Sequence, residues 1–281
     1  MYLPRELTYP PVFALGCLIG SFLNVCIYRM PRDRSVVFPP SHCPQCGARL
    51  RTIDLVPLFS FLFLGRKCRS CGGPISWRYF TVELLTGLVF LAVWEASGGS
   101  PQVFPWWVFS AVVIAVVFTD IDHMIIPDKL VIAGLLAAAL SEAIQVAAGQ
   151  PLLSVRIPGT EIGLPRVVAG GVVGWVVFVA IRGFSQLLFR REGMGLGDVK
   201  LAGAIGAMLG PKLALLGFAL AVAAGAVLGI VLIVLRLRRR MEYLPFGPFL
   251  AVSALAVLLA PIPIERTALS LYRSWAALLG G

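Results

Sequence analysis

The chain has 281 residues, of which 58% are hydrophobic and only 14% are charged. Soluble domains carry about 25% charged residues, so this composition excludes an ordinary soluble globular protein. The formal net charge of +10 does not indicate nucleic-acid binding, because the basic residues lie between long uncharged runs, where they set membrane topology. The sequence therefore predicts an all-α polytopic protein of a lipid bilayer, with no nucleic-acid partner.

The uncharged runs predict about eight transmembrane helices. The first run, 7–28, is too long for the apolar part of a secretory signal, and we expect it to be retained as a helix. A polar insertion at 29–78 follows, and a short run at 201–211 would give only about 16 Å of helix. We expect the other helices at 79–94, 96–119, 130–148, 167–189, 213–235 and 243–264, with a polar connection at 149–165 and a C-terminal tail at 265–281.

The distribution of Lys and Arg predicts which loops face the cytoplasm. The segments 29–78, 120–129, 182–200 and 236–240 hold 18 of the 24 basic residues. All four lie on one side only if 201–211 crosses the membrane. We therefore expect eight crossings with both termini outside, 201–211 being an interrupted or thin-membrane segment.

The insertion at 29–78 contains two CxxC pairs separated by 21 residues. Each pair can direct two sulfurs at one tetrahedral ion, and the glycines that follow allow tight turns. This predicts a structural Zn²⁺ site with a closed shell, because disulfides are rare in the cytoplasm. Four reduced thiols or a redox pair remain the alternatives. The expected ligands are Cys43, Cys46, Cys68 and Cys71; Cys17 and Cys26, within the first helix, are expected to fill the core.

Two acidic clusters border the apolar runs. Asp198 follows a glycine-rich stretch, Gly193 to Gly197, and Asp120 and Asp122 end the run at 96–119. The predicted topology places both clusters at the cytoplasmic face, where two carboxyl groups at one depth can share a proton and activate water against a peptide carbonyl. The alternative is that these carboxylates lie at loop ends exposed to solvent. A carboxylate at a bilayer is costly, however, and is by default treated as a candidate functional residue.

Several of these segments, in this order, resemble the bifunctional bacterial type IV prepilin peptidases, which are intramembrane aspartyl proteases with a GxGD signature. Gly195-Leu196-Gly197-Asp198 matches that signature. The other matching segments are Gly20 to Val25 with Tyr28-Arg29, the two CxxC pairs, Pro74 to Ser76 with Arg78-Tyr79 and Glu83, and Asp120 to Asp128. Asp54-Leu55-Val56-Pro57 departs from the Asp-Asn-Ile-Pro common in the family.

The resemblance implies an enzyme of the bacterial cytoplasmic (inner) membrane. Such enzymes cleave the basic leader from type IV prepilins or type II secretion pseudopilins after a glycine. They then methylate the new N-terminus with S-adenosylmethionine.

Carried over to this sequence, the catalytic acids are expected at Asp120 and Asp198, with Asp122 as the rival of Asp120. Gly195, Gly197 and Lys200 are expected to support them, and the glycines to admit an extended substrate peptide. The methyltransferase half is linked to the cysteine loop. The expected cofactor contacts are Glu83, Asn24, Arg66 and Lys67, whose alternative role is to anchor that loop to the first two helices.

Two other functions remain open on sequence grounds. A GxGD protease with another substrate would share the aspartates, but the four-cysteine loop argues against it. A proton-coupled transporter could use the same acids as a relay, but transporters usually show internal repeats and acids near the midplane, and neither is evident here.

Overall fold

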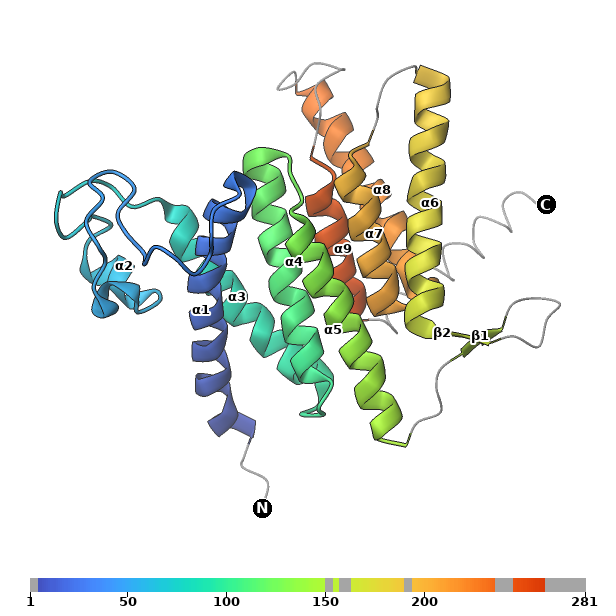
Figure 1. The fold of residues 1–281 in the computed structure, drawn as a ribbon, viewed down its shortest axis with the longest axis horizontal. Coiled ribbons are helices and arrows are strands. Elements are labelled where there is room, and N and C mark those ends of the chain that lie inside the picture. The colour runs from blue at the N-terminus through green and yellow to red at the C-terminus, as the bar shows by residue number, and fades with distance from the viewer. Residues whose placement is uncertain (1–4, 150–153, 157–162, 190–193, 236–244, 261–281) are drawn as a thin grey trace. The chain divides into compact units, whose positions relative to one another are not determined.

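The computed structural model describes residues 5–149, 154–156, 163–189, 194–235 and 245–260, and they are almost entirely helical (Figure 1). The chain divides into two compact units, Met1–Thr119 and Asp120–Gly281. The elements in chain order are α1 (Arg5–Arg29), η1 (Met30–Arg32), η2 (Thr52–Leu55), α2 (Phe59–Phe63), α3 (Trp77–Ser97), α4 (Val103–His123), α5 (Asp128–Ala147), β1 (Ser154–Arg156), β2 (Gly163–Pro165), α6 (Arg166–Phe189), α7 (Leu196–Leu209), α8 (Pro211–Val234) and α9 (Gly247–Leu259).

Six helical segments of the described chain are long and apolar enough to cross a membrane: Glu6–Arg32, Trp77–Ser97, Val103–His123, Asp128–Ala147, Arg166–Leu188 and Pro211–Val234. The polytopic all-α architecture is therefore confirmed, whereas the count of eight crossings stays a prediction. The two remaining expected crossings coincide with shorter helices, α7 with 14 residues and α9 with 13. Gly193, the basic cluster at 236–240 and the tail at 265–281 lie outside the described residues.

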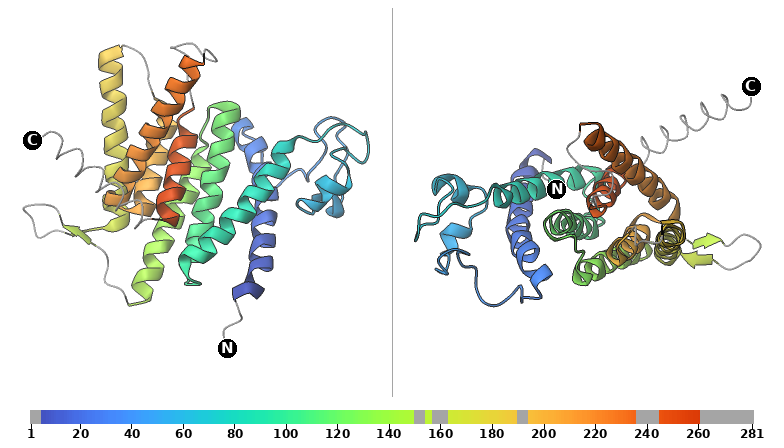
Figure 2. Two further views of the ribbon diagram at one scale, coloured as in Figure 1. Left: turned by 180° about the vertical axis from the view of Figure 1, so that it is seen from behind. Right: turned by 90° about the horizontal axis from the view of Figure 1, so that it is seen from above.

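The first unit is built on a close crossing of α1 and α3, which lie side by side in both views of Figure 2. Gly16 and Gly20, one turn apart on α1, face the backbone of α3. A Cβ at Gly16 would lie 2.7 Å from Cα of Gly87, and one at Gly20 would lie 2.7 Å from Cα of Glu83. Small residues let helix backbones approach this closely. The crossing brings Asn24, one further turn along α1, near the start of α3.

The second unit surrounds α7, which contacts α5, α6, α8 and α9. Every residue from Leu201 to Gly210 is buried, and a helix that is apolar all round belongs in a core. Glycines again set the approach: a Cβ at Gly206 would overlap the carbonyl oxygen of Gly170 on α6. Because α7 begins at Leu196 instead of 201, Asp198 lies in its first turn.

Two helix ends bear on the sequence predictions. The helix expected to end at Asp120 continues to His123, so both Asp120 and Asp122 are helical.

In the connection at 149–165, the strands β1 and β2 pair antiparallel, with Ser154 opposite Pro165. Glu142 accepts hydrogen bonds from the backbone N–H groups of Arg166 and Val167 at 3.1 and 3.2 Å, which satisfies the start of α6. Cys17 and Cys26 are buried in the core, as predicted.

Candidate functional site

Two carboxyl groups from different helices lie within electrostatic reach of each other in the second unit. Asp120, in the last turn of α4, is 6% exposed, and Asp198, in the first turn of α7, is half-buried. The charge of Asp120 acts on Asp198, so the two groups lie within electrostatic reach. The backbone N–H of Gly195, the residue capping α7, donates to the Asp198 carboxylate. An acid at the third helical position that reaches back to the cap residue is half of a capping box, which explains why this helix begins here.

The third helix at this site is α9, which sequence reasoning missed. The backbone N–H of Gly247 donates to Oδ2 of Asp120 at 2.9 Å. A Cβ at position 247 would lie 2.7 Å from that oxygen, so only glycine fits. The available signal was the segment Pro245-Phe246-Gly247-Pro248, with a glycine between prolines at the start of an apolar helix.

The residues expected to support the aspartates occupy different environments. Asp122 is exposed, in contrast to the buried Asp120. Lys200 extends to the surface and pairs with Asp128 on α5, with Nζ 2.7 Å from Oδ1. Such exposed pairs contribute little to stability. Lys200 therefore links α7 to α5 at the surface.

The two glycines before Asp198 differ in what surrounds them. A Cβ at Gly197 would lie 3.0 Å from Cβ of Ile126, so the missing side chain accommodates this chain's own Ile126. A Cβ at Gly195 would meet Oδ2 of Asp198 at 3.5 Å and the backbone nitrogen of Gly197 at 3.9 Å, both ordinary contacts, and Gly195 is exposed. Of the two, Gly195 leaves the carboxylate approachable.

The four loop cysteines form one cluster in the first unit. Their sulfur atoms all lie within 4.8 Å of one another, and the sulfurs of Cys43 and Cys71 are 4.0 Å apart. Gly47 and Gly72 both adopt φ +71°, a left-handed conformation that suits glycine. Their N–H groups each donate at 2.9 Å to the first cysteine of their pair, which closes the two turns. The cluster can therefore bind a metal ion.

The thiols of Cys68 and Cys71 shift in opposite directions. Backbone N–H groups of Cys71 and Ser70 lower the pKa of the Cys68 thiol to about 7, which favours the thiolate form that binds metals. The pKa of the Cys71 thiol is raised to about 11: the backbone N–H of Gly73 lowers it, but contacts with the other three cysteines and burial outweigh that effect. His42 is not a member of the cluster, and its Nδ1 lies 3.1 Å from the carbonyl oxygen of Pro40.

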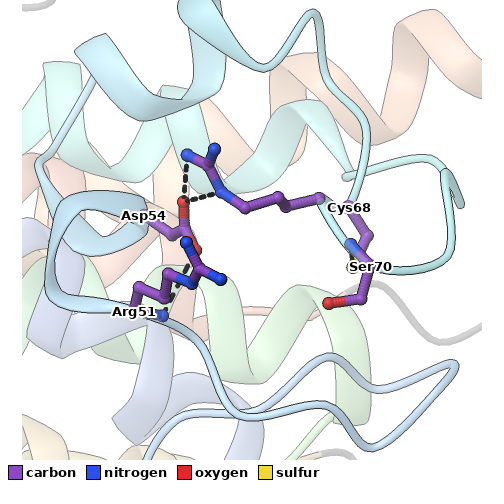
Figure 3. A network of polar contacts seen from close by, with 5 residues as sticks. Arg51, Asp54, Cys68 and Ser70 are labelled. Carbon is purple, nitrogen blue, oxygen red and sulfur yellow. Dashed lines mark hydrogen bonds and ion pairs between the residues drawn. The ribbon is translucent and has the colours of Figure 1, made fainter.

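An ion pair joins the two halves of the cysteine loop (Figure 3). Oδ1 of Asp54 accepts from Nε and Nη2 of Arg69 at 2.9 and 2.7 Å, and Oδ2 accepts from the backbone N–H of Arg51 at 3.2 Å. The hydrogen bond from Arg69 is the main reason that the pKa of Asp54 lies below its ordinary value. The segment between the cysteine pairs is thus tied to the second pair.

Only two of the four expected cofactor contacts come together. Asn24 of α1 and Glu83 of α3 line one cavity of about 500 Å³ beneath the cysteine loop, and both are buried. Arg66 and Lys67 are not among its lining residues. The guanidinium of Arg66 instead lies over the ring of Trp77, 4.7 Å from its centre, and the backbone of Lys67 pairs with Pro74.

Comparison with known proteins gives a consistent result along the chain. Residues 14–96 match the model of the bacterial peptidase A24 N-terminal domain, and residues 107–230 match that of the type IV leader peptidase family. A prepilin leader peptidase/N-methyltransferase of Myxococcus xanthus is 38% identical over 79% of this chain and 62% of its own length. Proteins of the same name from Aeromonas hydrophila and Pseudomonas aeruginosa are 33% and 31% identical, over 91% and 90% of both chains. No solved structure is significantly similar to the chain.

Proposed function

The chain belongs to the type IV leader peptidase family, and on this premise we propose that it removes the leader of type IV prepilins or type II secretion pseudopilins and N-methylates the new terminus. The observation that carries the proposal is the pairing of Asp120 and Asp198, two carboxyl groups from separate helices at one site. As a multi-pass membrane enzyme, it would act at the cytoplasmic face of the bacterial inner membrane.

Cleavage would proceed by general acid–base catalysis shared between the two aspartates. One carboxylate takes a proton from water as the water oxygen attacks the scissile carbonyl carbon. The other carboxyl group then protonates the leaving nitrogen, which breaks the C–N bond. Two coupled carboxyl groups suit this reaction because one can stay protonated while the other is ionised.

The surroundings of the pair favour Asp120 over Asp122 as the first acid. Asp120 is buried and held by the N–H of Gly247, whereas Asp122 is exposed. A fixed carboxylate in a water-poor site exerts stronger electrostatic effects than an exposed one. The exposed Gly195 beside Asp198 would leave room for an extended substrate backbone.

We further propose that the cysteine cluster binds structural Zn²⁺. Four thiolates at Zn–S bonds of about 2.3 Å lie about 3.8 Å from one another in a tetrahedron, and the observed sulfurs, all within 4.8 Å, need only a small contraction. Four cysteine ligands leave no open coordination position. The ion would hold the loop without entering either reaction, as Cys43, Cys46, Cys68 and Cys71 fill its shell.

For the second activity, bound S-adenosylmethionine would supply the methyl group to the amine nitrogen of the new terminus, leaving as the thioether S-adenosylhomocysteine while the proton of the amine passes to water. The residues proposed to hold this cofactor are Asn24 and Glu83, which share a cavity. Arg66 and Lys67 lie outside that cavity and would instead anchor the loop, Arg66 through its contact with the ring of Trp77 and Lys67 through its backbone pairing with Pro74.

One experiment tests both activities. The protein in lipid nanodiscs is mixed with a prepilin and S-adenosylmethionine, and the mass of the pilin is read before and after. Loss of the leader with gain of one methyl group is expected. Loss of the leader alone contradicts the methyltransferase assignment, and an unchanged mass with several pilins contradicts the peptidase and favours a transporter, which a proteoliposome flux assay would detect.

A further inference from the structure

The polar insertion between α1 and α3 contains a short apolar helix, α2, with the sequence FSFLF. Three of its five side chains are exposed: Phe59 to 61%, Leu62 to 62% and Phe63 to 86%. The rings of Phe59 and Phe63, one turn apart, stack with their centres 6.4 Å apart. A contiguous group of large exposed apolar side chains marks an interaction surface.

The opposite side of α2 is attached to the beginning of α3. Phe61 is 4% exposed, and its ring centre lies 5.2 Å from that of Trp77 and 5.3 Å from that of Phe80. The backbone N–H of Leu58, the residue before α2, donates to the carboxylate of Glu83 at 2.8 Å. The three partners on α3 lie in its first two turns. These contacts fix α2 beside that end of the helix.

The attached end of α3 corresponds to one border of the bilayer. Trp77–Ser97 is a candidate membrane span of 21 residues. Such a helix is about 31 Å long, close to the roughly 30 Å of the hydrocarbon core. Its first turn contains Trp77 and Tyr79, residue types that are enriched at membrane–water borders. The ribbon views place α2 to the side of α1 and not beyond its end (Figures 1 and 2). The exposed face of α2 therefore lies level with a bilayer border.

Positive charge accompanies this apolar face. Arg66 and Lys67 follow α2 directly in the chain, and both are exposed. The guanidinium of Arg66 lies over the ring of Trp77, 4.7 Å from its centre, which keeps the charge beside the same helix end. The whole insertion, 29–78, holds nine Lys or Arg against two Asp. Basic residues next to an apolar face are suited to the border of an anionic lipid bilayer.

We propose that α2 inserts into the bilayer border, with its three exposed side chains among the acyl chains and with Arg66 and Lys67 at anionic lipid headgroups. A second copy of the chain is a poorer partner. Three side chains of this size offer less than the area of about 800 Å² per partner that a stable protein interface needs. The cysteine loop is then held beside the membrane by lipid as well as by α3.

Photolabelling of the full-length protein measures this lipid contact. The protein in nanodiscs that contain a phospholipid with a diazirine in its acyl chain is irradiated and digested with trypsin. Cleavage after Arg51 and Arg66 releases α2 in one peptide. We expect label on Phe59, Leu62 and Phe63 comparable to that on the candidate span α8, with the buried Phe61 unlabelled. Label on α2 as low as that on the exposed cysteine turn at 44–47 would overturn the proposal.

The headgroup contact is tested by changing the lipid charge. Label on α2 from a phosphatidylglycerol probe should exceed label from a phosphatidylcholine probe at least about twofold. This preference should disappear in the double variant Arg66→Gln/Lys67→Gln. The control Arg32→Gln/Arg34→Gln removes two exposed charges elsewhere in the insertion and should keep the preference. Equal labelling of α2 by both probes in the unaltered protein would refute the contact with anionic headgroups.

A crosslinker on the protein distinguishes the bilayer from other occupants of this face. With p-benzoylphenylalanine in place of Phe63, irradiation in nanodiscs should give adducts of the mass of one phospholipid. Covalent dimers of the chain, or adducts with an added prepilin in place of lipid, would show that a protein covers α2 and would contradict the proposal.

Discussion

The backbone N–H of Gly247 donates a hydrogen bond to Oδ2 of Asp120 at 2.9 Å, although the two residues lie 127 positions apart. The contact ties the last turn of α4 to the first residue of α9. It orients the carboxyl group whose charge acts on Asp198, and the start of a helix is a favourable place for a negative charge. Gly247 is therefore proposed to position the first catalytic acid.

Gly247→Ala tests this positioning role. A Cβ 2.7 Å from Oδ2 must displace the carboxyl group, and small misplacements of a reacting group cost up to about 100-fold in rate. We expect kcat for leader cleavage to fall at least about tenfold with KM little changed, measured with a purified prepilin. Gly229→Ala on α8, where a Cβ meets nothing within 4 Å, is the control. An unaltered kcat in Gly247→Ala would refute the role.

The two aspartates themselves are tested by isosteric replacement. Asp120→Asn and Asp198→Asn each remove the ability to carry and release a proton, and general acid–base catalysis contributes about 10²–10⁴-fold per group. We expect cleavage to fall by at least about 10³-fold while expression stays normal. Asp122→Asn, at the exposed position on the same helix, should keep most activity. Substantial cleavage by Asp198→Asn would sink the assignment.

Removal of the metal should separate the two activities. Cys68→Ser is expected to abolish bound zinc, measured by elemental analysis, because a thiolate is lost from the four-sulfur cluster. Methylation and S-adenosylmethionine binding should fall with it, since Cys68 also lines the cavity. Leader cleavage should persist in part. Cys26→Ser, a buried cysteine outside the cluster, should keep its zinc; retention of zinc by Cys68→Ser would contradict the four-sulfur site.

The ion pair between Asp54 and Arg69 predicts a specific pH response. The guanidinium of Arg69 lowers the pKa of Asp54 in the folded protein. The stabilisation that this ion pair provides is therefore fully present above the pKa of Asp in the unfolded chain, about 3.9. It is lost as the pH falls through the lower pKa of the folded state. From pH 5 to 8, hydrogen exchange in peptides spanning 51–64, which exclude the cysteines, should therefore stay constant after correction for intrinsic rates. Asp54→Asn should exchange faster throughout that window. Asp33→Asn, an exposed acid of the same insertion, is the control; a rise in exchange between pH 8 and 5 in the unaltered protein would contradict the prediction.

The contact of α6 with α7 predicts a stability effect. A Cβ at Gly206 would overlap the carbonyl oxygen of Gly170, and overpacking of this kind costs about 1–3 kcal/mol. Gly206→Ala should therefore lower the midpoint of thermal unfolding in detergent by several degrees. Gly183→Ala on α6, where nothing lies within 4 Å, should leave it unchanged. Equal midpoints for both variants would show that the helices can separate without cost.

The sequence by itself determined the features that depend on neighbours along the chain. Uncharged runs indicated the long helices because a bilayer requires continuous apolar segments, and the CxxC spacing indicated the cysteine cluster because each pair is a local turn. The aspartates stood out because carboxylates beside apolar runs are costly. Helix ends were less accurate: α7 begins five residues before the expected position, since its cap is set by Gly195 and the reach of Asp198.

Only the tertiary structure decided the contacts between segments far apart in the sequence. No local pattern shows that the N–H of Gly247 meets Asp120, that Gly20 brings Asn24 and Glu83 to one cavity, or that Arg66 turns instead to Trp77. The role of Gly197, which accommodates Ile126, was hidden for the same reason. Hydropathy and spacing report a residue's own helix or turn, whereas the partners of a buried polar group depend on how the helices pack.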